Sequence, residues 1–187
     1  DEMAFLIGMC GQSQKYDAIH KVRQNWQDQV KSLDRRMQEA VDATEFQTPA
    51  QSLNETMRWS KATIASLHHY IDDWFLPMPC PAEYNFFFTH DLLVTGLGAM
   101  FYDAEFLRNG FEFLHSITEA DSILPHAYYW KDDHFQTEKC FSSNWNHLWF
   151  IISASAYLKH SGDAAMIEKL YPILQKSLAM MLENISD

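Results

Sequence analysis

The sequence predicts an all-α fold built from antiparallel helical hairpins. Apolar residues recur every three or four positions over most of the 187 residues, which is the spacing of a helix face. After residue 11, no segment shows the strict alternation of apolar and polar residues that indicates a half-buried strand. With 47% apolar and 21% charged residues, the chain has the composition of a protein that folds.

The first 45 residues are expected to form a short strand and a long helix. The run from Met3 to Met9 is apolar except for Gly8, which suits a buried strand, and Gly11 ends it. Ser13 is placed to cap a helix that continues to about residue 42. The apolar positions of this helix form one stripe on a largely polar surface: Ile19, Val22, Trp26, Val30, Leu33 and Met37. Such a helix typically braces or bridges other parts of a protein.

Five further helices are expected between residues 46 and 187. Pro49 suits the first turn of a helix, and Asp91 and Asp103 suit N-caps. Gly162 suits a C-terminal cap, and Pro172 should kink the last helix or mark its true start. The expected helices span residues 49–75, 91–103, 103–118, 146–161 and 163–186.

Two segments are expected to be loops. Residues 77–81 contain three prolines, which exclude a regular helix. Residues 121–145 combine turn formers, charges and aromatic residues without a clean period. A loop of this length in a compact domain is usually functional or disordered.

The charge balance excludes several classes of partner. Fourteen basic and 25 acidic residues give a formal net charge of −11, which disfavours general binding to nucleic acid or to an anionic membrane surface. No apolar run approaches the length of a membrane span. The sequence has no CxxC pair, no helical His pair and no glycine-rich phosphate loop, so no metal or cofactor is expected.

Four segments of the sequence, in order, resemble the six-hairpin glycosidases, the (α/α)6-toroid enzymes typified by glucoamylases and glycogen-debranching enzymes. They are TPAQSLNETMRWSKATI, NFFFTHDLLVTGLGAM, DAEFLRNGFEFLHSITEADSILPHAYYW and NHLWFIISASAYLKHSGDAAMIEKLYPILQKSLAMML. The resemblance covers roughly residues 48–187. It implies that residues 46–187 are the N-terminal portion of a toroid domain, and that residues 1–45 end a preceding β-sandwich and its linker helix.

The resemblance also implies a function, with two departures from the family pattern. A complete toroid has more helices than the five expected here, so the general acid and base of the family would lie outside this chain. Asn146 stands where many members have Asp, so no carboxylate role is expected there. The implied activity is acid/base hydrolysis of α-glucosides or related oligosaccharides.

The candidate substrate-binding residues are His90, Asp91, Tyr84, Trp130, Lys131 and Trp145. In the resembling family, the residue that matches Asp91 binds the sugar at the cleavage point. A carboxylate at a helix start is held ionised by backbone N–H groups, and it can accept hydrogen bonds from sugar hydroxyls. His90 is a possible donor beside it, and aromatic rings such as Tyr84 and Trp130 can stack on the C–H faces of sugars. A plain N-cap for Asp91 and a structural role for His90 remain open.

An alternative interpretation is a non-catalytic helical interaction module. An incomplete helical array should expose an apolar groove, which would bind a peptide or a second copy of the chain. The expected partner is an oligosaccharide under the first interpretation, and a peptide or another copy of the chain under the second. Binding of malto-oligosaccharides distinguishes the two.

Overall fold

The computed structural model of the chain describes residues 15–80, 83–84, 86–118, 123–139 and 145–183. Over these residues the protein is mainly helical, with two small antiparallel sheets. The strand expected at residues 3–9 and its cap Ser13 lie outside the described residues. In chain order the elements are α1 (Lys15–Asp42), α2 (Gln51–Ser66), β1 (His68–Ile71), β2 (Trp74–Pro77), β3 (Phe87–Phe88), α3 (Thr89–Ala99), α4 (Ala104–Ile117), β4 (Ala127–Lys131), β5 (His134–Glu138), α5 (Asn146–Ser161) and α6 (Ala164–Glu183).

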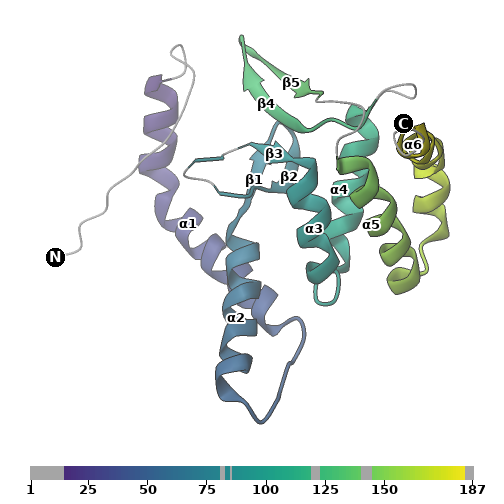
Figure 1. Cartoon of the computed structure of the whole chain (residues 1–187). Coiled ribbons are helices and arrows are strands. Elements are labelled where there is room, and N and C mark those ends of the chain that lie inside the picture. The colour runs from purple at the N-terminus through teal and green to yellow at the C-terminus, as the bar shows by residue number, and fades with distance from the viewer. Residues whose placement is uncertain (1–14, 81–82, 85, 119–122, 140–144, 184–187) are drawn as a thin grey trace.

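Helix α1 is the long, largely polar helix that the sequence predicts, and its N-terminal part extends away from the other helices (Figure 1). Most of its apolar stripe stays exposed, including Ile19, Val30 and Leu33. The half-buried positions gather at its C-terminal end, where α1 packs against α2. The N-terminal part of the stripe is therefore an apolar surface without a partner among the described residues.

Lys61 joins the end of α1 to α2. Its side chain is buried, and its Nζ donates to the Val41 carbonyl at 3.2 Å, to the Thr44 carbonyl, and to the Thr44 Oγ1 at 2.9 Å. The last carbonyls of a helix lack intrahelical donors and carry partial negative charge, so an ammonium group there is stabilising. Lys61 thereby fixes the direction in which α1 leaves α2.

Helices α3 to α6 form two layers of antiparallel hairpins (Figure 1). Helix α3 turns into α4 through residues 100–103, and α5 turns into α6 at Gly162 and Asp163. Across the hairpins, α3 packs on α5 and α4 packs on α6, so alternate helices share a layer. The core lies between these layers and under the strands, with Phe87, Leu92, Leu93, Leu107, Phe111, Phe113, Leu114, Phe150 and Leu170 among its fully buried side chains.

The ends of these helices follow the local signals in the sequence. Asp103 caps α4 by accepting from the Glu105 amide at 3.1 Å. Gly162 ends α5 in the left-handed conformation, with φ of 71°. Asp163 then accepts from the Met166 amide in the first turn of α6 and from the Tyr157 hydroxyl, and these hydrogen bonds hold its pKa below the usual value. Helix α6 continues through Pro172, so this proline does not mark its start.

The expectation that no strand follows residue 11 was wrong. The helix expected at 49–75 ends at Ser66, and a hairpin of β1 and β2 follows. Its two-residue turn places Asp72 at a φ of 54°. Part of the long loop expected at 121–145 is a second hairpin, β4 and β5, whose turn places Asp132 and Asp133 at positive φ. Asp tolerates this region better than most residues, so these turns form without Gly.

Candidate functional site

The N-terminal ends of α3 and α5 meet at one backbone carbonyl, that of Pro125. Thr89, the first residue of α3, donates from Oγ1 to the Pro125 oxygen at 2.6 Å. Asn146, the first residue of α5, donates from Nδ2 to the same oxygen at 3.3 Å. All three residues are buried. The segment that leads into β4 therefore sets the positions of both helix starts.

Contacts further along the two helices show that they run parallel. His90 lies edge-on to Trp149, with ring centroids 6.0 Å apart. One turn later, the Ser153 hydroxyl donates to the Leu93 carbonyl at 3.1 Å. The pairs are separated by nearly the same number of residues in the sequence, which is the pattern of parallel helices. The positive ends of two helix dipoles consequently lie side by side.

The indole N–H group of Trp149 has no hydrogen-bond acceptor among the described residues. Its nitrogen, Nε1, is buried. A buried N–H group without an acceptor costs free energy, and such groups commonly find a partner in water or a ligand. The contact with His90 places this group on the side of α5 that faces α3.

The sequence predicted Asp91 as the N-cap of α3, and this prediction was wrong. Asp91 lies in the first turn of the helix. The cap position is Phe88, and the helix begins two residues before Asp91 because Thr89 is held at His126 and Pro125. Asp91 lines a cavity of about 120 Å³ with residues of α2, β2 and α3 such as Ile64, Pro77 and Thr95. Its carboxylate forms no hydrogen bond or ion pair with the described residues. It remains close to the positive end of the α3 dipole.

An aromatic cluster covers one face of the three-stranded sheet of β3, β4 and β5. The ring of Phe86 lies 4.7 Å from that of Phe88 and 5.7 Å from that of Tyr129. Tyr84 lies edge-on to Phe88 at 5.7 Å, and Phe88 lies edge-on to His126 at 5.4 Å. The neighbouring residue Phe87 points to the other face and is fully buried in the core. The three consecutive phenylalanines are thus divided between a surface cluster and the core.

Trp130 lies on the opposite face of the sheet from this cluster. It pairs with Phe135, against which it packs edge-on at 4.9 Å, and 59% of its surface is exposed. Lys131, the next residue, points to the face of Tyr129 because side chains alternate along a strand. The structure therefore does not place Tyr84 and Trp130 on one wall. Trp130 is also absent from the cavity that Asp91 lines.

Trp145 sits at the N-cap position of α5 and is largely exposed. Its carbonyl accepts from the Trp149 amide at 3.1 Å. Of the predicted site residues, His90 and Asp91 lie in the first turn of α3, Trp145 lies at the start of α5, and Tyr84 contacts Phe88 just before α3. The cavity that Asp91 lines includes none of the other predicted site residues. Trp130 and Lys131 belong to the projecting β4–β5 hairpin (Figure 1).

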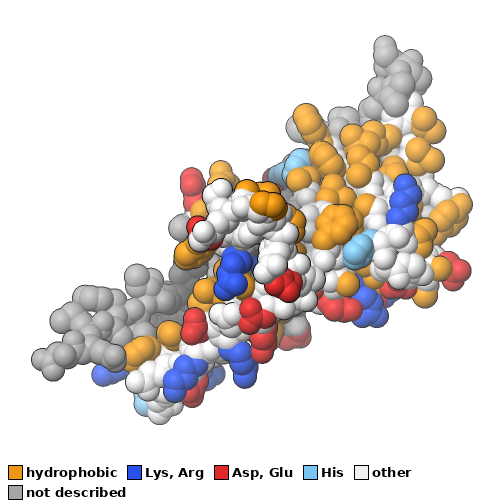
Figure 2. Space-filling model, turned by 90° about the horizontal axis from the view of Figure 1, so that it is seen from below, with side chains coloured by type: hydrophobic (Ala, Val, Ile, Leu, Met, Phe, Trp, Pro, Cys, Tyr) orange, Lys and Arg blue, Asp and Glu red, His pale blue; other side chains and the backbone are white. Residues whose placement is uncertain are grey.

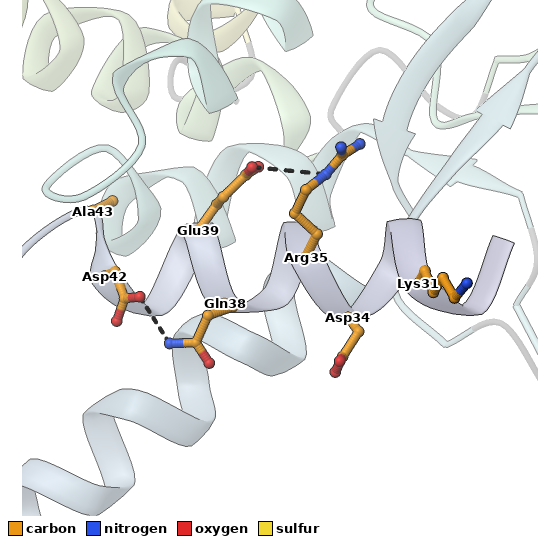
Figure 3. Close-up of a pocket in the computed structure, with 7 residues that line it drawn as sticks. All are labelled: Lys31, Asp34, Arg35, Gln38, Glu39, Asp42 and Ala43. Atoms are coloured by element: carbon orange, nitrogen blue, oxygen red, sulfur yellow. Dashed lines mark hydrogen bonds and ion pairs between the residues drawn. The ribbon is translucent and has the colours of Figure 1, made fainter. Parts of the chain in front are cut away.

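A broad open hollow of about 640 Å³ lies elsewhere, along α1 (Figure 3). Its lining comes from one helix and the residue that follows it. Two pairs of these side chains interact with each other: Arg35 with Glu39 at 3.8 Å, and Gln38 with Asp42 at 2.8 Å. Side chains of a single exposed helix that satisfy one another form a solvated surface, and we assign no ligand to this hollow.

Several features of the helix ends were missed at the sequence level. Thr89, Asn146 and Trp149 were not recognised as site residues, because their role depends on the parallel packing of α3 and α5. The alternation of Phe86 and Phe88 was an available signal for the aromatic face, whereas the pairing that adds Tyr129 to it was not. Among the described residues, no group of three His, Cys, Asp or Glu side chains is arranged to bind a metal ion.

The comparisons with known proteins give no family for this chain: it matches no family model, no curated protein and no solved structure. Within the described part of the chain, every helix is too short or too polar to cross a membrane.

Proposed function

We propose that this chain is part of a glycoside hydrolase that acts on α-glucosides or related oligosaccharides. The carrying observation is the pair of parallel helices α3 and α5, whose first residues meet at Pro125 beside an aromatic face. Alternate helices in two layers are the arrangement expected for a portion of an (α/α)6 toroid. The resemblance of residues 48–187 to six-hairpin glycosidases points to the same architecture.

The proposal gives each residue at the helix ends a chemical role. Asp91 accepts hydrogen bonds from sugar hydroxyls, assisted by the positive end of the α3 dipole. His90, which lies edge-on to Trp149, supplies a donor. Trp145 and Tyr84, both exposed, offer rings for the C–H face of a sugar.

Glycoside hydrolysis requires two carboxyl groups that flank the scissile bond. Asp91 is the only acidic residue in the first turns of α3 and α5, over the part of each helix that is described. We therefore assign Asp91 to substrate binding, and the general acid and base to residues beyond those described here.

Isothermal titration calorimetry with maltotriose tests the proposal. The chain should bind the sugar weakly and saturably, and Asp91→Asn should weaken binding by about tenfold or more, because a hydrogen bond to a charged group is worth ~1.5–3 kcal/mol. Asp28→Asn, on the exposed part of α1, is the matched control and should bind as the parent does. Equal heats for the parent and Asp91→Asn, or no heat at all, would count against the proposal.

A second candidate function is a non-catalytic interaction module. Helix α6 exposes large apolar side chains at Tyr171, Leu178 and Leu182. Apolar side chains cover much of the end of the molecule that carries α3 to α6 (Figure 2). An apolar area of this kind marks interaction surfaces. This function predicts self-association and no effect of Asp91→Asn on any sugar binding.

A further inference from the structure

Strand β5 forms one edge of the three-stranded sheet, whose order is β3, β4, β5. It pairs with β4 on one side, and no described strand pairs with its other side. The hairpin that it forms with β4 projects beyond the helices (Figure 1). The outer side of β5 therefore presents backbone N–H and C=O groups that have no strand partner among the described residues.

The turn of the hairpin shows which backbone groups of β5 face outward. It is a two-residue turn, so Lys131 and His134, which flank it, form a hydrogen-bonded pair. Hydrogen-bonded and non-hydrogen-bonded pairs alternate along an antiparallel ladder. Phe135 and Thr137 therefore belong to non-hydrogen-bonded pairs with β4, and their N–H and C=O groups point away from it.

Strand β5 lacks the features that usually block pairing at a sheet edge. Such edges commonly carry a proline, a lysine or a bulge. The sequence of β5 is HFQTE, and its register with β4 is continuous. Phe135 also adds an aromatic surface beside the edge: its ring stacks on Tyr128 at 5.4 Å, and Trp130 lies edge-on to it at 4.9 Å.

The sequence of β5 is complementary to itself in one antiparallel register. When Gln136 lies opposite Gln136 of a second copy, His134 lies opposite Glu138 and Phe135 lies opposite Thr137. An acidic side chain then meets a basic type of side chain on both sides of the axis, which favours cross-strand pairing. The same register brings the outward-facing groups of Phe135 and Thr137 together as hydrogen-bonded pairs.

The alternative registers that keep these outward-facing groups paired are less favourable. A shift by two residues in one direction places Glu138 opposite Asp132 of the other copy, and like charges directly opposite are destabilising. A shift in the other direction places Glu138 opposite Gln136 and so loses the pair with His134. Charge thus selects the register that is centred on Gln136.

We propose that β5 pairs antiparallel with β5 of a second copy of the chain, with the two-fold axis between the two Gln136 residues. The two sheets then form one sheet with three strands from each copy. The rings of the two Phe135 residues become diagonal neighbours on one face. Two five-residue strands make a small interface, so the association is weak and reversible. It uses a different surface from the apolar face of α6, and it does not depend on the proposed function.

Disulfide capture tests the pairing. The variants are made in a chain whose native cysteines, Cys10, Cys80 and Cys140, are replaced by serine, and they are treated with oxidised glutathione. Gln136→Cys should form a covalent dimer on a non-reducing gel. The reason is that Cα atoms in a non-hydrogen-bonded pair are about 4.5 Å apart, within the range that a disulfide spans.

Two further cysteine variants test the register. His134→Cys and Glu138→Cys should each stay monomeric alone, because each residue lies about 13 Å or more from its own copy across the axis. An equimolar mixture of the two should form the covalent dimer. Both positions are exposed, and Gln136 is half-buried, so random collisions would favour these two variants over Gln136→Cys.

Thr137→Pro, added to Gln136→Cys, removes the N–H group that points towards the second copy. Proline is accepted on an edge strand where this group faces solvent, so the fold should persist, and circular dichroism checks this. Each copy loses one hydrogen bond, which should weaken association by about tenfold or more and lower the yield of dimer. Leu178→Glu with Leu182→Glu, on α6, is the control and should leave the yield unchanged.

Four results would overturn the inference. Gln136→Cys could give no more dimer than Glu138→Cys alone, or the mixture of the His134 and Glu138 variants could fail to cross-link. Thr137→Pro could leave the yield unchanged in a folded chain. Loss of the dimer in the α6 variant would show that α6, and not β5, joins the two copies.

Discussion

At the scale of single residues, several polar side chains are buried, and some of their contacts join two elements. Lys61, on α2, binds carbonyls at the end of α1, and Ser153, on α5, binds α3. Hydrophobic periodicity assigns polar residues to the surface and so overlooks such positions. Lys61 lies four residues after Met57, in register with the apolar face of its helix, and that register was a readable signal of burial.

His147 gives a prediction about pH at this scale. It is buried in the first turn of α5, its Nδ1 pairs with Ser177 Oγ at 2.9 Å, and burial lowers its pKa below the usual 6.5. Since the unfolded chain then binds the proton more readily, the free energy of unfolding should fall as pH drops below about 6.5. Urea denaturation at a series of pH values between about 8 and 5, the range in which an ordinary His titrates, measures the free energy of unfolding.

The matched variants are His147→Gln, which keeps a hydrogen-bonding group beside Ser177, and His134→Gln, at an exposed position of β5. The pH dependence should become shallower in the first variant and stay as in the parent in the second. His68 titrates in the same direction, so part of the slope should remain in His147→Gln. Identical slopes in all three proteins would contradict the role assigned to His147.

At the scale of elements, α3 and α4 approach closely through glycine. A Cβ on Gly96 would lie 2.2 Å from Leu107 Cδ2, and a Cβ on Gly110 would lie 2.5 Å from Leu92 Cδ1. Both leucines are buried in the core and have little space to move. Glycine at position 96 therefore permits the close approach of α3 to α4.

Substitution of the two α3 glycines should therefore have opposite effects. Gly96→Ala should lower the free energy of unfolding by about 1–3 kcal/mol, through overpacking against Leu107. Gly98→Ala meets nothing within 4 Å, so it should raise stability by about 0.5–1 kcal/mol, as Ala is the better helix former. Guanidinium denaturation of the two variants and the parent provides the measurement. If both substitutions destabilised the protein to the same extent, the contact between position 96 and Leu107 would not be the cause of the destabilisation.

The helix ends were more predictable than the strands. Asp103, Gly162 and Asp163 act within one turn of their own position, so their roles are readable locally. The hairpin turns at Asp72 and at Asp132 lack the Asn-Gly or Asp-Gly signature, and strands of four or five residues carry little periodicity. The position of Asp91 was misread because long-range bonds from Thr89 start α3 earlier.

At the scale of the whole molecule, the exposed apolar surface predicts self-association. Tyr171, Leu178 and Leu182 are seven and four residues apart, so they share one face of α6. Sedimentation velocity should show a concentration-dependent dimer or larger species, which Leu178→Glu with Leu182→Glu should shift towards the monomer. Gln27→Glu with Gln29→Glu adds equal charge on exposed α1 without removing apolar area, and should have no such effect. A monomer at all concentrations would contradict this prediction.

The candidate site was only partly predictable, because it is a property of the assembled molecule. His90, Asp91 and Trp145 could be found from the sequence, since helix starts are readable. That α3 and α5 run parallel, and that Trp130 and Tyr84 fall on opposite sheet faces, depends on pairings between residues about 40 to 60 positions apart. One-dimensional periodicity contains no information on such pairings.

The shared acceptor at Pro125 has a mechanical consequence. One oxygen atom receives a donor from the first residue of each of two helices, and the same chain segment continues into the β4–β5 hairpin. A force on the hairpin would consequently act on both helix starts at once. Neither helix start could move away from Pro125 without breaking its hydrogen bond to this oxygen. A displacement of the hairpin is therefore expected to move the first turns of α3 and α5, which carry Asp91 and Trp149.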